Sequence, residues 1–183
     1  MPVEVTTWYL EMLDPAQLRP KLIDHPQLEI RQATVPCPEF SRFLYASVGG
    51  AWYWCDRLGW SRDRWLAYLD RPQVETWVAY LAGTPAGYIE LEAQPAAQVE
   101  IAYFGLLPQF VGQGLGGHLL TVGVQRAWQV AHRRVWVHTC SLDGPAALKN
   151  YEARGFSLYD TRTAPKDLPP QPPGPWPGWA AGA

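Results

Sequence analysis

The sequence has no long hydrophobic run and no excess of charge of either sign. Nowhere do eighteen apolar residues follow one another, so no segment is predicted to span a membrane. The 183 residues include 15 Lys plus Arg and 17 Asp plus Glu, which gives a formal net charge of −2. A general nucleic-acid-binding protein usually has a basic excess. We therefore expect neither nucleic acid nor a membrane as a partner.

Cysteine is scarce, and the first residues do not resemble a secretory signal. The three cysteines, Cys37, Cys55 and Cys140, are widely spaced and form no metal-ligand pattern. Residues 1–5 have neither the basic head nor the apolar stretch of a leader peptide. These features favour a reduced, cytoplasmic protein with no metal site, and they leave one buried disulfide open as an alternative.

Hydrophobic and aromatic residues are plentiful enough to build a core. The chain is 48% hydrophobic and contains ten Trp and nine Tyr, which predicts one domain over residues 1–164. Prolines crowd residues 165–183 and predict an extended tail. The tail is either a polyproline ligand for another protein or, as we favour, a segment that is mobile or wraps its own domain through Trp176 and Trp179.

The period of the hydrophobic pattern changes along the chain and predicts a mixed α/β fold. Strands are expected at 5–12, 28–33, 74–82, 86–93, 99–107, 134–140 and 156–161, and helices at 38–46, 62–69, 114–132 and 145–154. Gly83 and Pro85 mark a hairpin turn, while Ser61 and Asp143 are expected to cap the helices that follow them. The order predicts an antiparallel meander followed by helix, strand, helix and strand.

A cluster of glycines separates the expected strand 99–107 from the helix that follows. The cluster contains Gly112, Gly114, Gly116 and Gly117. The free N–H groups at a helix N-terminus and the helix dipole favour an anion, and glycine lets a diphosphate approach the backbone closely. No lysine or arginine lies in this loop, so backbone donors are expected to carry most of the binding. Glycines that serve close packing alone are the structural alternative.

Two familiar nucleotide motifs do not fit this loop. Gly112, Gly114 and Gly117 match Gly-x-Gly-x-x-Gly, but residues 108–111 separate the loop from the strand, and an antiparallel meander precedes it. The dinucleotide fingerprint instead follows the first strand of a parallel sheet directly. A phosphate-binding P-loop would end in Gly-Lys-Ser or Gly-Lys-Thr, which this loop lacks. Neither ligand class is favoured.

The loop resembles the acetyl-CoA-binding motif of the GNAT acetyltransferase superfamily, Gln/Arg-x-x-Gly-x-Gly/Ala. Gly114 and Gly116 match its glycines, and Val111 stands at the Gln/Arg position. Residues 147–156 resemble a second motif of this family, Ala-x-x-x-Tyr-x-x-x-Gly-Phe, with Tyr151 as the tyrosine. The two motifs occur in the order and spacing of the family.

The resemblance implies a mostly antiparallel sheet with flanking helices and a V-shaped splay between strands 99–107 and 134–140. Acetyl-CoA, the co-substrate, is expected in this splay, bound by the core at 74–164, while residues 1–73 shape the acceptor side. The residues expected to bind it are Phe104, Leu106, Val111, Gly112, Gln113, Gly114, Gly116, Gly117 and Asn150. The implied acceptor is a primary amine of a small molecule or peptide, and a homodimer is compatible with this fold.

Two residues are candidates for proton transfer during direct attack of the amine. Tyr151 matches the family tyrosine that can protonate the departing thiolate, although it could also be an ordinary buried tyrosine. Glu100 resembles the base glutamate of histone-acetylating members and would take the amine proton directly or through a water; its alternative is a paired or solvated acid. Glu90 and Glu92 are alternates for the base or for attracting a cation.

The region before the hairpin combines tryptophans with acidic residues. It contains Trp52, Tyr53, Trp54, Trp60 and Trp65 together with Asp56, Asp63 and Asp70. These residues predict either an aromatic, acidic pocket for an organic cation or, as we favour, amphipathic helices that bury their tryptophans against the sheet. The alternative to an enzyme is a module of the same fold that binds an acyl-CoA or a protein without catalysis.

Overall fold

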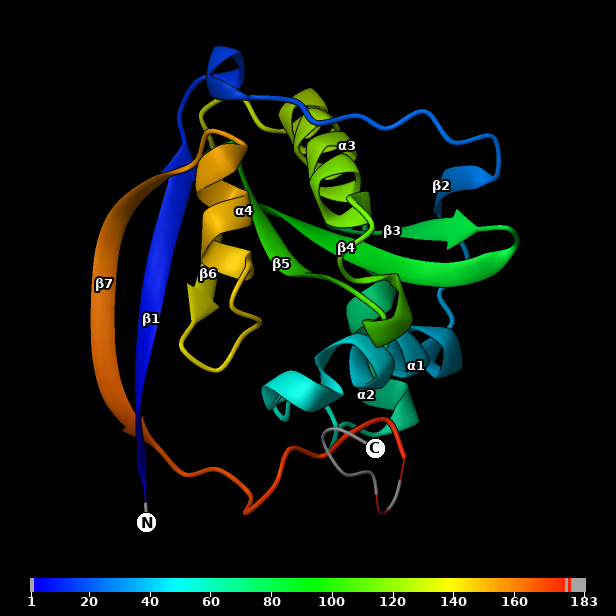
Figure 1. Cartoon of the computed structure of the whole chain (residues 1–183), viewed down its shortest axis with the longest axis vertical. Helices are drawn as coiled ribbons and strands as arrows, with labels where there is room; N and C mark the ends of the chain where they lie inside the picture. The colour runs from blue at the N-terminus through cyan, green and yellow to red at the C-terminus, as the bar shows by residue number, and fades with distance from the viewer. Residues whose placement is uncertain (1, 177, 179–183) are drawn as a thin grey trace.

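The computed structural model describes residues 2–176 and 178, which fold around one seven-stranded sheet. The strands lie in the order β2-β3-β4-β5-β6-β1-β7 (Figure 1). Their bounds are β1 (Val3–Met12), β2 (Leu28–Gln32), β3 (Val74–Leu81), β4 (Thr84–Gln94), β5 (Gln98–Leu106), β6 (Arg134–Cys140) and β7 (Ser157–Lys166). The predicted mixed, mostly antiparallel sheet is confirmed.

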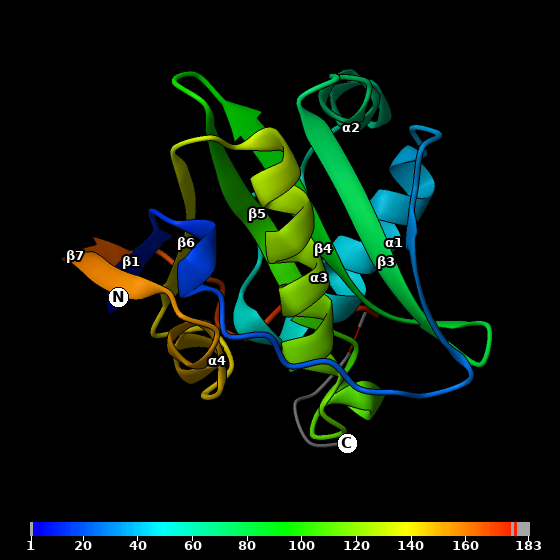
Figure 2. The same cartoon turned by 90° about the horizontal axis from the view of Figure 1, so that it is seen from above.

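Helices cover both faces of this sheet (Figure 2). They are α1 (Pro38–Gly49), α2 (Arg62–Leu69), α3 (Leu115–Val130) and α4 (Ala147–Ala153), with short 3-10 helices η1 (Pro15–Gln17), η2 (Gly50–Trp52) and η3 (Pro108–Phe110). The α3 helix lies on one face and the α1 and α2 helices on the other. Of the helices in the described residues, none combines the length and hydropathy that crossing a membrane requires.

The long helix α3 forms because its apolar side chains recur at helical spacing. Leu119, Leu120, Val124 and Ala127 are fully buried and belong to the main core, together with residues of β4, β5 and β6. At the start of α2, the Ser61 hydroxyl accepts a hydrogen bond from the backbone N–H of Arg64, so Ser61 caps this helix as predicted.

The expected cap of α4 is wrong. The N-cap of this helix is Ala146, which makes no side-chain capping bond, and the helix begins two residues later than predicted. The carboxylate of Asp143 instead accepts bonds from Thr139 and Cys140 on the preceding strand. Asp143 therefore orders the end of β6 rather than the start of α4.

The central feature of the sheet is the parallel pair β5–β6. Pairing runs from Gln98 opposite Arg134 to Ile101 opposite Val137 and then stops, although β5 continues to Leu106 and β6 to Cys140. Beyond Ile101 the two strands diverge, which is the predicted V-shaped splay (Figure 1). The edge of β5 in this splay has backbone N–H and C=O groups released from pairing with β6.

The last strand is longer than predicted. The sequence placed its end at residue 161, because the prolines that follow disfavour a central strand, but β7 pairs with β1 as far as Lys166. This is possible because β7 is the outer strand of the sheet. A proline lacks a backbone N–H, and on an outer strand the missing donor can face solvent without the loss of a hydrogen bond between strands. β1 lies between β6 and β7 and is antiparallel to both.

The proline-rich tail returns to its own domain. From β7 it runs beneath the sheet toward α1 (Figure 1), where the Gly174 N–H donates to the Gly50 carbonyl at 3.1 Å. Gly174 is buried, whereas Trp176 is 68% exposed. Contrary to the expectation, Trp176 therefore does not anchor the tail. Trp179 lies outside the described residues. The described part of the tail thus follows the wrapping interpretation.

Candidate active site

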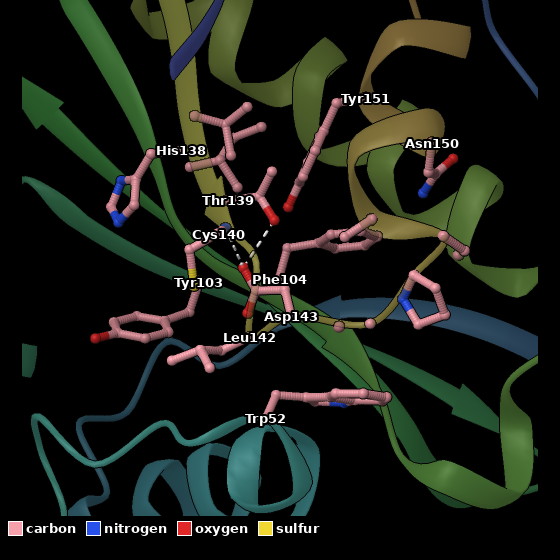
Figure 3. Close-up of a pocket in the computed structure, with 18 of the residues that line it drawn as sticks. Trp52, Tyr103, Phe104, His138, Thr139, Cys140, Leu142, Asp143, Asn150 and Tyr151 are labelled. Atoms are coloured by element: carbon pink, nitrogen blue, oxygen red, sulfur yellow. Dashed lines mark hydrogen bonds between the residues drawn. The ribbon is translucent and has the colours of Figure 1, made fainter. Parts of the chain in front are cut away.

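A cavity of about 980 Å³ lies at the splay of β5 and β6. Its walls come from the diverging ends of both strands, the glycine loop, α4 and the Trp52–Trp54 segment (Figure 3). Of the residues expected to bind acetyl-CoA, the lining includes Phe104, Leu106, Val111, Gly112, Gly114, Gly116, Gly117 and Asn150. Gln113 is exposed and does not line it; its side-chain amide donates to the Gln109 carbonyl at 2.8 Å.

The glycine loop has the form of an anion site. Gly112 and Gly114 have φ of +86° and +81°, conformations that side-chain-bearing residues rarely adopt. A Cβ at Gly112 would meet nothing within 4 Å, and one at Gly114 would only touch Ile23 at 4.0 Å, so space lies open beside the backbone. No side chain caps the start of α3, which leaves its first N–H groups available. These residues fit a diphosphate such as that of CoA.

Four basic side chains that sequence reasoning missed also line this cavity. They are Lys21, Lys149, Arg154 and Lys166. A Cβ at Gly117 would lie 2.7 Å from the Lys21 side chain and 2.8 Å from the Arg154 guanidinium, so both cations flank the first turn of α3. The Lys21 backbone is fixed there, because its N–H donates to the Thr121 hydroxyl at 2.9 Å. Cations from outside the loop therefore add to its backbone donors.

Tyr151 lies on α4, which forms one wall of the cavity. Its ring packs edge to face against Phe104 and Phe156, with centroids 5.9 and 6.0 Å apart, and is 5% exposed. The hydroxyl points into the cavity beside Thr139 (Figure 3). Burial, with a smaller contribution from the charge of Asp143, raises the pKa of Tyr151 well above its usual range. The phenol is therefore a proton donor at neutral pH.

Asp143 joins two walls of the cavity. Its carboxylate accepts hydrogen bonds from the Thr139 hydroxyl at 2.7 Å, the Cys140 N–H at 2.8 Å and the Trp54 indole N–H at 3.2 Å. The first two bonds order the end of β6, and the third holds the Trp52–Trp54 segment against it. Asp143 thus holds the end of β6 and the Trp52–Trp54 segment together at one side of the cavity.

Glu100 lies beside the cavity rather than in its lining. The carboxylate accepts a hydrogen bond from the Gln94 amide at 2.6 Å and lies 3.5 Å from His138 Nδ1. Its side chain is 14% exposed, whereas His138 lines the cavity. Glu100 itself does not line the cavity, but it contacts His138, which does.

The alternate acids, Glu90 and Glu92, are already paired with arginines. Glu90 is 2% exposed, lies 2.9 Å from the Arg57 guanidinium and accepts a bond from the Tyr68 hydroxyl at 2.6 Å. Glu92 lies 2.8 Å from the Arg71 guanidinium. Their charges are neutralised inside the protein, and a substrate cation would have to displace an arginine to reach them.

Some aromatic side chains before the hairpin form a cation-binding cage, as the first interpretation predicted, and others are buried against the sheet, as the second predicted. Arg57 lies over the rings of Tyr68, Tyr103 and Trp60 at 4.1, 4.4 and 4.9 Å, so an aromatic cage exists but the protein's own guanidinium fills it. Trp65 is 1% exposed, as expected of a helix that buries its tryptophan. The cavity lining includes Trp52, Tyr53, Trp54 and Asp56 but neither Asp63 nor Asp70.

The cysteines are free, including the one in the cavity. Cys37, Cys55 and Cys140 form no disulfide, and Cys140 lines the cavity two residues after His138. Burial, followed by the charge of Asp143, raises the pKa of the Cys140 thiol, which disfavours the nucleophilic thiolate. Across residues 2–176 and 178, no three His, Cys, Asp or Glu side chains are grouped as metal ligands would be.

Comparisons with known proteins agree with this geometry. A family model described as the Acetyltransferase (GNAT) family matches residues 40–156. A mycothiol acetyltransferase from Corynebacterium aurimucosum is 37% identical over 86 residues, which are 45% of this chain and 28% of that protein. The chain thus spans less than a third of the length of this relative.

Solved structures share the fold at low sequence identity. A GCN5-related N-acetyltransferase from Sphaerobacter thermophilus matches with a TM-score of 0.66 and 16% identity, covering 89% of this chain and 51% of that one. Another from Kribbella flavida matches with a TM-score of 0.62 and 18% identity, covering 85% and 55%. Because the family model spans well over half of the sequence, the chain belongs to the GNAT family of acetyltransferases.

Proposed function

We propose that this protein is an acetyl-CoA-dependent N-acetyltransferase that acts on a primary amine of a small molecule or peptide. The observation that carries the proposal is that one cavity of about 980 Å³ has both the glycine loop and Tyr151 in its lining. Acyl transfer from CoA needs a site for the diphosphate and a proton donor near the sulfur, and these two features can supply them.

Binding of acetyl-CoA would use backbone groups from the start of α3 and from the edge of β5. Bound acetyl-CoA supplies the activated acetyl thioester. The free N–H groups at the start of α3 would hold its diphosphate, with Lys21 and Arg154 beside them. The β5 edge at Phe104–Leu106, unpaired with β6, would hydrogen-bond the pantetheine arm as an added strand does.

Proton transfer would come from two sides of the cavity. The Tyr151 hydroxyl would donate its proton to the departing sulfur, since its raised pKa keeps it protonated. Glu100 would supply the negative charge that draws the proton from the attacking amine. Direct attack is favoured over an acyl-cysteine, because burial keeps the Cys140 thiol protonated. The free thiols suit a cytoplasmic setting.

The test combines equilibrium binding of CoA with a thiol-release assay over a panel of primary amines. The proposal predicts CoA binding and release of free thiol that depends on the amine. Binding of CoA without thiol release for any amine would instead support the non-catalytic module of the same fold.

A further inference from the structure

His138 is the titratable side chain that connects Glu100 to the cavity. It lies on β6, its side chain is 45% exposed, and its Nδ1 is 3.5 Å from a Glu100 carboxylate oxygen. With Nδ1 directed at Glu100, Nε2 is left for a group in the cavity. Thr139, the next residue of the strand, points toward Tyr151, whereas the His138 ring lies on the opposite side (Figure 3).

A chain of hydrogen bonds fixes the carboxylate behind His138. The Trp136 indole N–H donates to Gln94 at 3.0 Å, and the Gln94 amide donates to Glu100 at 2.6 Å. Glu100 stands opposite Trp136 in the parallel register of β5 and β6, so the sheet itself sets this geometry. The His138 ring packs near both Tyr9 and Trp136, at centroid distances of 5.8 and 6.1 Å. Both members of the pair are thus held in place.

We infer that His138 is the catalytic base for the acceptor amine and that Glu100 is its positioning residue, an inference that rests on the proposed function. A histidine held by a carboxylate on one nitrogen can accept a proton on the other. The 3.5 Å separation is long for a hydrogen bond, as such pairs often are before substrate binds.

In the proposed step the acetyl group moves from the sulfur to the amine nitrogen. The amine nitrogen forms a bond to the acetyl carbon while the bond from that carbon to sulfur breaks. His138 Nε2 takes the proton from the amine, and the Tyr151 hydroxyl gives its proton to the sulfur. A proton then returns from His138 to Tyr151 through solvent, so the products are an amide and a free thiol. The base and the acid approach from opposite faces of β6.

Other ionisable groups lie near the imidazole or line the same cavity. They are Glu100 on β5, Tyr9 on β1, Cys140 on its own strand, and Tyr103, Asp56 and Lys166, which line the same cavity. Lys166 lies 3.5 Å from Asp56, so these two charges largely offset each other. Burial raises the pKa of the Tyr103 phenol, which stays neutral. Glu100 is therefore the charged group in contact with His138.

The experiment measures kcat/KM against pH with acetyl-CoA and one fixed amine, the panel member that wild type turns over fastest. The value is expressed per concentration of the neutral amine, so that protonation of the acceptor itself does not contribute to the profile. In the wild type the rate should fall at low pH, where the base is protonated. His138→Gln should lower kcat about 100-fold or more and remove this fall. Glu100→Gln should lower kcat by roughly tenfold and keep it. His132→Gln, on an exposed histidine after α3, is the matched control and should match wild type.

Chemical rescue provides a second readout that a structural role would not change. Adding imidazole to His138→Ala should restore turnover in a concentration-dependent way, and it should not restore Glu100→Gln. CoA affinity and the thermal unfolding midpoint should be unchanged in the variants.

Three results would contradict the inference that His138 is the base. If His138→Gln keeps the wild-type rate and profile, the inference is wrong while the proposed function stands. If Glu100→Gln alone removes the fall at low pH, Glu100 is the base and His138 is not. If wild type binds CoA but releases no thiol with any amine, the proposed function fails, and this inference fails with it.

Discussion

Tyr151 on α4 packs edge to face against Phe104 on β5, with ring centroids 5.9 Å apart and planes at 62°. Phe104 belongs to the part of β5 that is not paired with β6, and Tyr151 belongs to α4, which lines the same cavity. The contact therefore holds the phenol at the level where the two strands separate. A group bound along that edge of β5 would therefore lie close to Tyr151.

Tyr151→Phe should slow turnover while leaving CoA binding nearly intact. The substitution removes the proton donor and keeps the ring contacts with Phe104 and Phe156, so kcat should fall about 100-fold. Stopped thiol-release assays and calorimetric CoA titration of the same preparation measure both quantities. Equal kcat for the variant and wild type would assign Tyr151 a packing role only.

Lys21→Ala should weaken CoA binding by several-fold. Lys21 lies beside the first turn of α3, where its charge would neutralise a phosphate, and this contribution should decrease as salt is added. The control is Arg31→Ala, which removes a similar charge from the exposed strand β2. A Kd for the Lys21 variant equal to that of the control at low salt would exclude a role in binding.

Glu90→Gln should destabilise the fold far more than a surface substitution does. It leaves the buried Arg57 guanidinium without its carboxylate, which typically costs about 3 kcal/mol of unfolding free energy. The control is Glu39→Gln, whose partner Arg62 is exposed and which should leave the urea midpoint unchanged. Similar midpoints for both variants would mean that the Arg57 cage tolerates loss of its counter-charge.

Glu75 should make part of the stability depend on acidic pH. Hydrogen bonds from Arg126, with a further bond from Trp77, lower the pKa of Glu75 in the folded state. This stabilisation is therefore present above the unfolded value of about 4.3 and is lost as the pH falls through the folded pKa. Urea unfolding should show Glu75→Gln to be about 1 kcal/mol less stable at pH 7. The gap should narrow as the pH falls through the folded pKa of Glu75; a gap that is independent of pH would contradict this assignment.

The parts of the fold that local sequence patterns control were predicted well. The strand 134–140 was predicted with the bounds that the structure has, because β-branched and aromatic residues alternate between turn signals at both ends. The glycine loop and Tyr151 were predicted from their resemblance to two family motifs. The end of β7 was placed too early, because a proline is compatible with a strand only at a sheet edge, and strand order is not a local property.

The parts of the site that sequence missed depend on long-range contacts. Lys21 lies in an irregular segment with no hydrophobic period and reaches the loop through Thr121, which is 100 residues away. The contact of His138 with Glu100 could not be predicted, since it follows from the parallel register of β5 and β6. The acidic and aromatic residues suggested a cage for a ligand cation, but the sequence could not show that Arg57 fills it.

Backbone groups at the start of α3 are proposed to bind the diphosphate of CoA. Gly114→Asp places a carboxylate at this point, and Gly83→Asp is a matched control: Gly83 has φ of +80°, open space around it and a position in the β3–β4 turn. Both variants introduce the same charge in the same backbone conformation. Calorimetric titration of CoA should give a Kd at least about tenfold higher for Gly114→Asp than for Gly83→Asp. Equal Kd values for the two variants, both matching wild type, would contradict the account.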